Sequence, residues 1–139
     1  MFGHILVPVD FTTRSLRAAR AAARVAATTR AETTLLHVIE RIDDEKSAEL
    51  MKFYSKLEKA AREKLEALLA PFAGKGLPVR AEIVYGKPVA EILRYAQANR
   101  IDLIVMSSHK LPLRGTGESW GTVSYKVGIL SRCPVLLVK

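Results

Sequence analysis

The sequence predicts an α/β domain in which a five-stranded parallel sheet lies between two layers of helices, a three-layer, Rossmann-like sandwich. Five short apolar runs, rich in branched residues, alternate with stretches whose apolar residues recur every three or four positions. Strands that alternate with helices are joined by right-handed crossovers, so the sheet should be parallel and covered on both faces. The length of 139 residues suits a single domain, residues 1–139, with a full hydrophobic core.

The first strand is expected at His4–Val9, with Pro8 near its end because proline cannot donate to a ladder. Thr12 or Thr13 can cap the helix that follows. That helix has a narrow, alanine-lined face that can approach a sheet closely. The face consists of Leu16, Ala19, Ala23 and Ala26.

The second strand is expected at Glu32–Val38, and residues 39–49 form a polar loop that leads into a long helix. Gly74 and Gly76 should end this helix, and Pro78 blocks its continuation. The apolar stripe of the helix consists of Met51, Tyr54, Ala61, Leu65, Leu68 and Phe72.

The rest of the chain supplies three strands and two helices. Val79–Tyr85 alternates apolar and polar residues, as in a strand near an edge of the sheet, and Asp102–Met106 and Pro134–Val138 are the fourth and fifth strands. Pro88 suits the first position of the third helix, and Ser119 can cap the fourth. The third helix should bury Val89, Ile92, Leu93 and Ala96, and the fourth Trp120, Val123, Val127 and Leu130.

The net charge of +8 favours anionic partners such as nucleotides, nucleic acid or acidic proteins, although a basic solvated surface gives the same value. Arg17, Arg20 and Arg24 share one flank of the first helix, either as an anion-binding stripe or as a solvated face. Charge is the only feature that favours a nucleic-acid-binding protein, so nucleic acid is not the expected partner. The aromatic residues form no base-stacking array on one strand.

The single cysteine, Cys133, rules out an internal disulfide framework and fits a reducing compartment. Its place before a strand predicts a small buried hydrophobe. The amino-terminal apolar run has no basic region in front of it, and no apolar run approaches the roughly 18 residues of a membrane span. The sequence therefore predicts a cytoplasmic protein without a membrane partner.

Residues 102–127 read as a buried strand, a polar loop with glycines, and the start of a helix. This order builds anion sites, because loop amides and the positive end of the helix dipole then face the same ligand. Asp10 and the loop after Met106 both follow strands, and ligands of such sheets bind at the carboxyl ends of the strands.

No catalytic constellation is visible in the sequence. It has no G-x-S-x-G elbow, no metal-spaced cysteine and histidine set, and no complete P-loop. His4 and His37 fall within predicted strands, which favours structural roles for both.

Six segments in this order resemble the universal stress protein domain and together span nearly the whole chain: ILVPVD, LLHV, YGKPVAEIL, DLIVMSSH, GTVSYKV and CPVLLV. The resemblance implies the adenine-nucleotide alpha-hydrolase-like fold, a role in stress response, and usually a homodimer that forms through the last strand. Many members of this family bind ATP, here expected with magnesium. Few members have an established activity beyond slow ATP hydrolysis, so the resemblance does not imply an enzyme.

Nucleotide-binding members of that family carry a glycine, two residues, a second glycine, nine residues, and then glycine followed by serine or threonine. Here Ser107 and Lys110 occupy the two opening glycine positions, and ten residues separate Lys110 from Gly121 and Thr122. The phosphate loop is therefore degenerate, although Lys110 could contact phosphate as a point charge. The resemblance implies a nucleotide site formed by Pro8, Val9, Asp10, Val38, Met106, Ser107, His109, Lys110, Gly121, Thr122 and Val123.

Two functions remain open on these residues. The surviving Gly121–Thr122 pair and Asp10 favour a regulatory stress protein that binds ATP or another adenine nucleotide. The replaced glycines favour a stress protein without nucleotide that acts as a dimeric interaction module.

Overall fold

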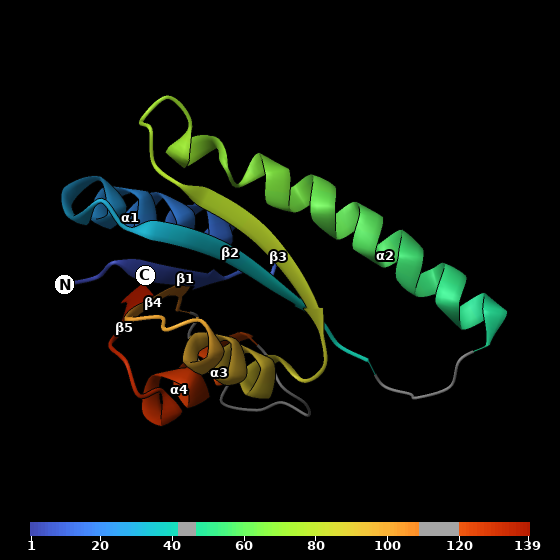
Figure 1. Ribbon diagram of the computed structural model, residues 1–139. Helices are drawn as coiled ribbons and strands as arrows, with labels where there is room; N and C mark the ends of the chain where they lie inside the picture. The colour runs from blue at the N-terminus through green and yellow to red at the C-terminus, as the bar shows by residue number, and fades with distance from the viewer. Residues whose placement is uncertain (42–46, 109–119) are drawn as a thin grey trace.

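The structure, a computed structural model, describes residues 1–41, 47–108 and 120–139. Helices cover both faces of one five-stranded sheet, so the predicted three-layer α/β fold is confirmed (Figure 1). The strands are β1 His4–Pro8, β2 Glu32–Ile39, β3 Val79–Tyr85, β4 Leu103–Ser107 and β5 Val135–Val138. The helices are α1 Thr13–Thr29, α2 Ala48–Ala67, the short 3₁₀ helix η1 Ala70–Phe72, α3 Pro88–Ala98 and α4 Trp120–Leu130.

All strand pairs are parallel, in the order β3-β2-β1-β4-β5. Successive residues of β1 point to opposite faces, so Ile5 and Val7 pack in one core cluster and Leu6 packs in the other. The first cluster contains residues of α1 and α2, and the second contains residues of α3 and α4. The predicted alanine-lined face of α1 is confirmed, although Leu16 is only partly buried. The buried residues of this face are Ser15, Ala18, Ala19, Ala22, Ala23 and Ala26.

Besides shifts of one residue at strand ends, four details of helix length and burial differ from the predictions. The long helix ends at Ala67 rather than near Gly74, because Pro71 cannot continue an α-helix and lies in the separate turn η1. Met51 is 59% exposed, since the amino-terminal half of α2 extends beyond the sheet (Figure 1). Leu130, the last residue of α4, is 58% exposed rather than buried. Cys133 is only partly buried, and its Sγ lies 3.3 Å from Ser131 Oγ.

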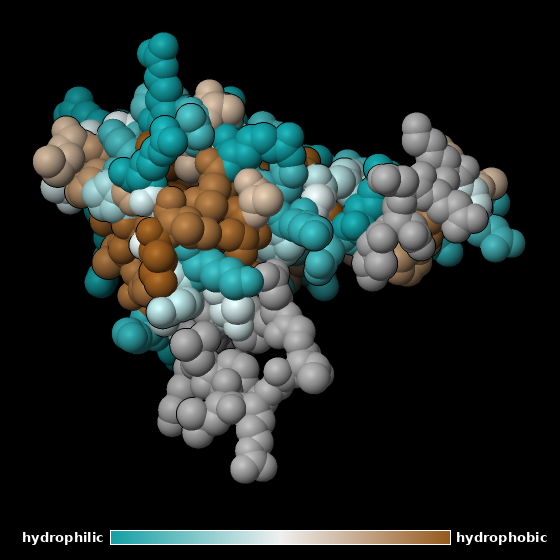
Figure 2. All heavy atoms as spheres, turned by 90° about the horizontal axis from the view of Figure 1, so that it is seen from below, coloured by the Kyte–Doolittle hydropathy of each residue, from teal (hydrophilic) through white to brown (hydrophobic). Residues whose placement is uncertain are grey.

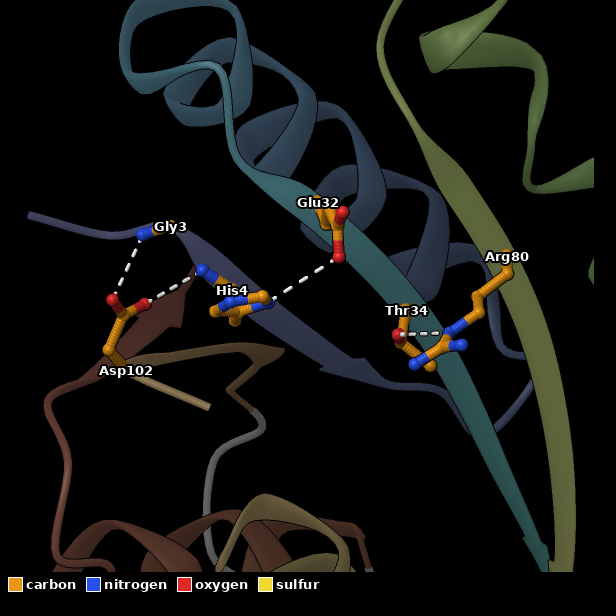
Figure 3. A network of polar contacts seen from close by, with 6 residues as sticks. All are labelled: Gly3, His4, Glu32, Thr34, Arg80 and Asp102. Atoms are coloured by element: carbon orange, nitrogen blue, oxygen red, sulfur yellow. Dashed lines mark hydrogen bonds and ion pairs between the residues drawn. The ribbon is translucent and has the colours of Figure 1, made fainter. Parts of the chain in front are cut away.

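Polar contacts tie the strands together at the amino edge of the sheet (Figure 3). The Asp102 carboxylate accepts hydrogen bonds from the amides of Gly3 and His4, at 2.9 and 3.0 Å. His4 Nδ1 in turn lies 3.6 Å from Glu32 Oε2. The hydrogen bonds of Asp102 thus link the starts of β1 and β4, and the exposed contact of His4 with Glu32 lies between β1 and β2. These contacts agree with the structural role predicted for His4. Among the described residues, no helix is long and apolar enough to cross a membrane.

Candidate functional site

The strand order reverses between β1 and β4, in the middle of the sheet. After β1 the chain continues to α1 and then to β2 on one side, whereas after β4 it continues to α4 and then to β5 on the other. Because α1 and α4 pack on opposite faces, the chain leaves these two neighbouring strands in opposite directions. Such a switch point opens a crevice at the carboxyl edge of a parallel sheet, and ligands of open α/β folds bind there.

Asp10 lies immediately beyond β1, at this edge, and organises the start of α1. Its Oδ1 accepts hydrogen bonds from the amide of Thr12 at 3.1 Å, from Thr12 Oγ1 at 2.8 Å and from Ser15 Oγ at 2.9 Å. Thr12, the capping residue by position, makes no side-chain cap hydrogen bond of its own. Asp10 therefore does the capping, and its partly exposed carboxylate also gives the crevice an acidic group.

Phe11 connects β1 to α1 in a left-handed backbone conformation, with φ of 65°. This conformation is uncommon for a bulky residue and costs of order 1–3 kcal/mol, so the surrounding contacts must hold it in place. The Phe11 ring lies against His37, with ring centroids 4.1 Å apart, and Lys64 Nζ lies 5.5 Å from the Phe11 ring centroid. Phe11 thus lies between β1 and α2, against His37 and Lys64.

His37, near the end of β2, is fixed by a backbone contact. Its Nδ1–H donates to the carbonyl of Val9 at 2.9 Å, which sets the tautomer. Burial lowers the pKa of His37, while the hydrogen bond to Val9 and the charge of Asp10 partly oppose that effect. Nearby Lys64 lowers the pKa further. These effects favour the neutral form of the imidazole, which supports the structural role that the sequence predicts.

Ser107 ends β4 with a buried hydroxyl that has no hydrogen-bond partner among the described residues. Side chains alternate along a strand, so Ser107 shares the face of Val105, which packs in the α1 cluster. The register of β1 and β4 pairs Ile5 with Leu103, and continuing it by four residues places Val9 opposite Ser107. The serine that replaces the first motif glycine thus turns its hydroxyl toward the layer opposite α4.

The first turn of α4 faces the same edge of the sheet. A crossover helix runs antiparallel to the strands that it joins, so the start of α4 lies above the carboxyl end of β4. Gly121 and Thr122 belong to this first turn, and Val123 anchors it in the core at 3% exposure. The first-turn amides and the positive end of the helix dipole favour an anion at this position.

Apolar side chains from neighbouring strands complete the crevice on the α4 face. Val38 packs against the core cluster that contains Met106 and Val123. A cleft of about 260 Å³ opens beside Val38 on the α2 side, where Phe11 and Lys64 also line it. That volume is below the roughly 300–1,000 Å³ of sites that enclose a drug-sized ligand. This cleft alone is therefore too small to hold a whole nucleotide.

Nine of the eleven predicted site residues belong to this edge of the sheet or to the first turn of α4, and His109 and Lys110 lie outside the described residues. The predicted set omitted Ser15 and Arg14. Ser15 bonds Asp10, and Arg14 Nη1 donates to the carbonyl of Ser108 at 3.3 Å. Both residues lie in the first turn of the helix that follows Asp10, and this position is the only feature of the sequence that could have indicated them. Within the described ranges, no three histidine, cysteine or carboxylate side chains are grouped to hold a metal.

Comparison with known proteins agrees with this geometry. The sequence profile of the universal stress protein family matches residues 1–139. Universal stress protein YxiE from Bacillus subtilis (strain 168) is 35% identical over 159 aligned positions, which cover 100% of both chains. The solved structure of the hypothetical protein MJ0577 has a TM-score of 0.82 and 31% identity, over 100% of this chain and 96% of that one.

Two more distant solved structures share the fold and hold adenine nucleotides. A universal stress protein in complex with cAMP has a TM-score of 0.72 and 24% identity, over 98% of this chain and 96% of that one. The universal stress protein from Archaeoglobus fulgidus in complex with dAMP has a TM-score of 0.71 and 20% identity, with full coverage of both chains. At these identities they show the fold alone. The profile match over the whole chain and the 35% identical relative establish that the chain belongs to the universal stress protein family.

Proposed function

We propose that the chain is a regulatory stress protein that binds an adenine nucleotide at the carboxyl edge of its sheet. The observation that carries this proposal is the switch point between β1 and β4, where Asp10 and the first turn of α4 face one crevice. The cAMP and dAMP complexes of the distant relatives support the choice of ligand class.

The described residues fit such a ligand. The first-turn amides of α4, at Gly121 and Thr122, would face the phosphates, and the helix dipole favours their charge. Val38, partly buried against the cluster that contains Met106, offers an apolar surface to the base. The Asp10 carboxylate accepts hydrogen bonds, as ribose hydroxyl groups require. A bound nucleotide would supply the phosphate charge, and the residues named here bind and orient it.

The role of Asp10 can be tested with two variants. Asp10→Asn keeps a side-chain oxygen for the cap, so we expect it to retain most of the stability of the parent. Asp10→Ala removes the cap and should cost about 1–2 kcal/mol in the free energy of unfolding, measured by denaturant titration.

The same two variants separate the structural role from binding. If the charge of Asp10 serves the nucleotide, Asp10→Asn should weaken ATP binding in calorimetry although its stability is nearly unchanged. Parental affinity in Asp10→Asn would limit this residue to capping α1 and remove it from the proposed site.

A second candidate function is a dimeric interaction module that works without nucleotide. The observation in its favour is apolar surface on α4 and β5 (Figure 2). The exposed side chains are Tyr125, Ile129, Leu130 and Leu136, at 55%, 62%, 58% and 42%. Since β5 is also an unprotected edge strand, we propose that two copies pair through β5. This pairing is compatible with either function.

Restoring the two motif glycines distinguishes the candidates. If the parent binds no nucleotide, the double variant Ser107→Gly and Lys110→Gly should create ATP binding, because glycine lets the backbone approach phosphate. A parent that already binds ATP tightly would rule out the module without nucleotide.

A further inference from the structure

A second cleft lies away from the carboxyl edge, on the outer face of α1. Its volume is about 1010 Å³, roughly four times that of the cleft beside Val38. Residues of α1 line one side, and the end of α2, η1 and Lys75 line the other. Seven of its eleven lining residues are apolar and four are cationic, and none is acidic. The cleft is therefore both apolar and strongly basic.

The floor of the cleft is the margin of the hydrophobic core. Leu16, Val25 and Val138 line the cleft and also pack, partly buried, against the core cluster beneath α1. When a partner removes the remaining apolar surface of such side chains from water, the complex is stabilised. A purely polar anion would leave this floor unused.

The rim consists of Arg17, Arg20, Arg24 and Lys75, all of which are exposed. None of these four side chains has a hydrogen bond or an ion pair with a described residue, and α1 contains no acidic residue. No described residue therefore pairs with these charges, which belong to a chain of net charge +8. Such a rim attracts an acidic partner and sets its orientation.

The spacing of the arginines narrows the class of partner. Arg17, Arg20 and Arg24 follow one another at three and four residues, so they span about 10 Å along α1. An amphipathic helix with carboxylates at the same spacing presents three acids over the same length, and guanidinium groups bind carboxylates in bidentate geometry. We propose that the cleft binds an acidic amphipathic helix of a partner protein, with its apolar side chains on Leu16 and Val25, which flank the arginines on α1, and its carboxylates on the arginines.

The full-length chain can be titrated against a fluorescent synthetic helix that carries glutamate at positions i, i+3 and i+7 and leucine at positions that flank the glutamates on the same face. We expect saturable binding by fluorescence anisotropy. The variant Arg17→Gln, Arg20→Gln, Arg24→Gln should weaken it about tenfold, since three exposed charge pairs are lost. The matched control, Lys52→Gln, Lys56→Gln, Lys59→Gln, removes three exposed cations of similar spacing from α2 and should change affinity less than about twofold.

A charge exchange distinguishes a lost contact from a lost fold in the arginine variant. Replacing the same three arginines by glutamate should abolish binding of the acidic helix and create binding of a helix with lysine in place of its glutamates. A peptide whose leucines are replaced by serine should bind the parent at least tenfold more weakly, because the apolar floor is then left uncovered.

Several results would overturn the proposal. They are equal affinity in the parent and the arginine variant, an equal loss in the lysine control, or full binding of the serine peptide. Tighter arginine-dependent retention on duplex DNA, or on phosphatidylserine vesicles, would assign the cleft to a different class of partner.

Discussion

Two equally buried serines at the carboxyl edge of the sheet differ in their hydrogen bonds, so their alanine variants can be compared directly. Ser15 and Ser107 are each 1% exposed, but Ser15 Oγ bonds Asp10 whereas Ser107 Oγ has no described partner. Removing an unsatisfied hydroxyl should relieve a desolvation cost, so Ser107→Ala should raise the free energy of unfolding by about 1 kcal/mol. Ser15→Ala should lower it by about 2 kcal/mol, because the Asp10 carboxylate loses a donor. Denaturant titration measures both, and a loss in Ser107→Ala as large as in Ser15→Ala would show that its hydroxyl has a partner such as ordered water.

His37 gives the fold a pH dependence whose sign follows from its environment. Burial lowers the pKa of His37 below its ordinary value of 6.5, so below that pH the unfolded chain takes up a proton that the folded chain resists. The free energy of unfolding should therefore fall as the pH drops through 6.5, and this fall should end below the folded-state pKa. Denaturant titrations between pH 7.5 and pH 5 test this.

Two histidine variants isolate the effect. His37→Gln should flatten this part of the curve, whereas His4→Gln keeps His37 and should retain it. An unchanged slope in His37→Gln would mean that another group is responsible.

Among the elements, the edge strand β5 is where we expect two copies of the chain to pair into a dimer. Leu136 is 42% exposed on this strand, and a lysine there should block edge-to-edge pairing because a charge would be buried in the contact. We expect the parent to sediment as a dimer at micromolar concentration and Leu136→Lys as a folded monomer. Phe53→Lys, at a position 54% exposed on α2, is the control and should remain dimeric. A monomeric parent would exclude pairing through β5.

For the whole molecule, periodicity was enough to predict the layers and the order of the elements. Val79–Tyr85 is a strand with the predicted bounds, and it lies at an edge of the sheet as its alternation indicates. The details that were predicted wrongly depend on neighbouring residues that the apolar spacing of a helix does not take into account. Leu68 and Phe72 are buried as the stripe predicts, yet the helix stops at Ala67 because Pro71 overrides the apolar spacing.

The candidate site was partly predictable for a similar reason. The position of Asp10 after a strand was sufficient to place it at the carboxyl edge, since parallel strands end together there. The contact of His37 with Val9 depends on the register of β1 and β2, and the bond of Ser15 to Asp10 depends on the left-handed turn at Phe11. Neither the strand register nor this backbone conformation can be predicted from the local amino-acid composition.

Nucleotide binding at the switch point is the central claim, and isothermal titration of the purified, nucleotide-stripped chain with ATP and magnesium tests it most directly. We expect one saturable site per chain, with dAMP competing for it, and an increase in melting temperature that grows with ATP concentration. No heat of binding and no thermal shift at millimolar ATP would contradict the claim.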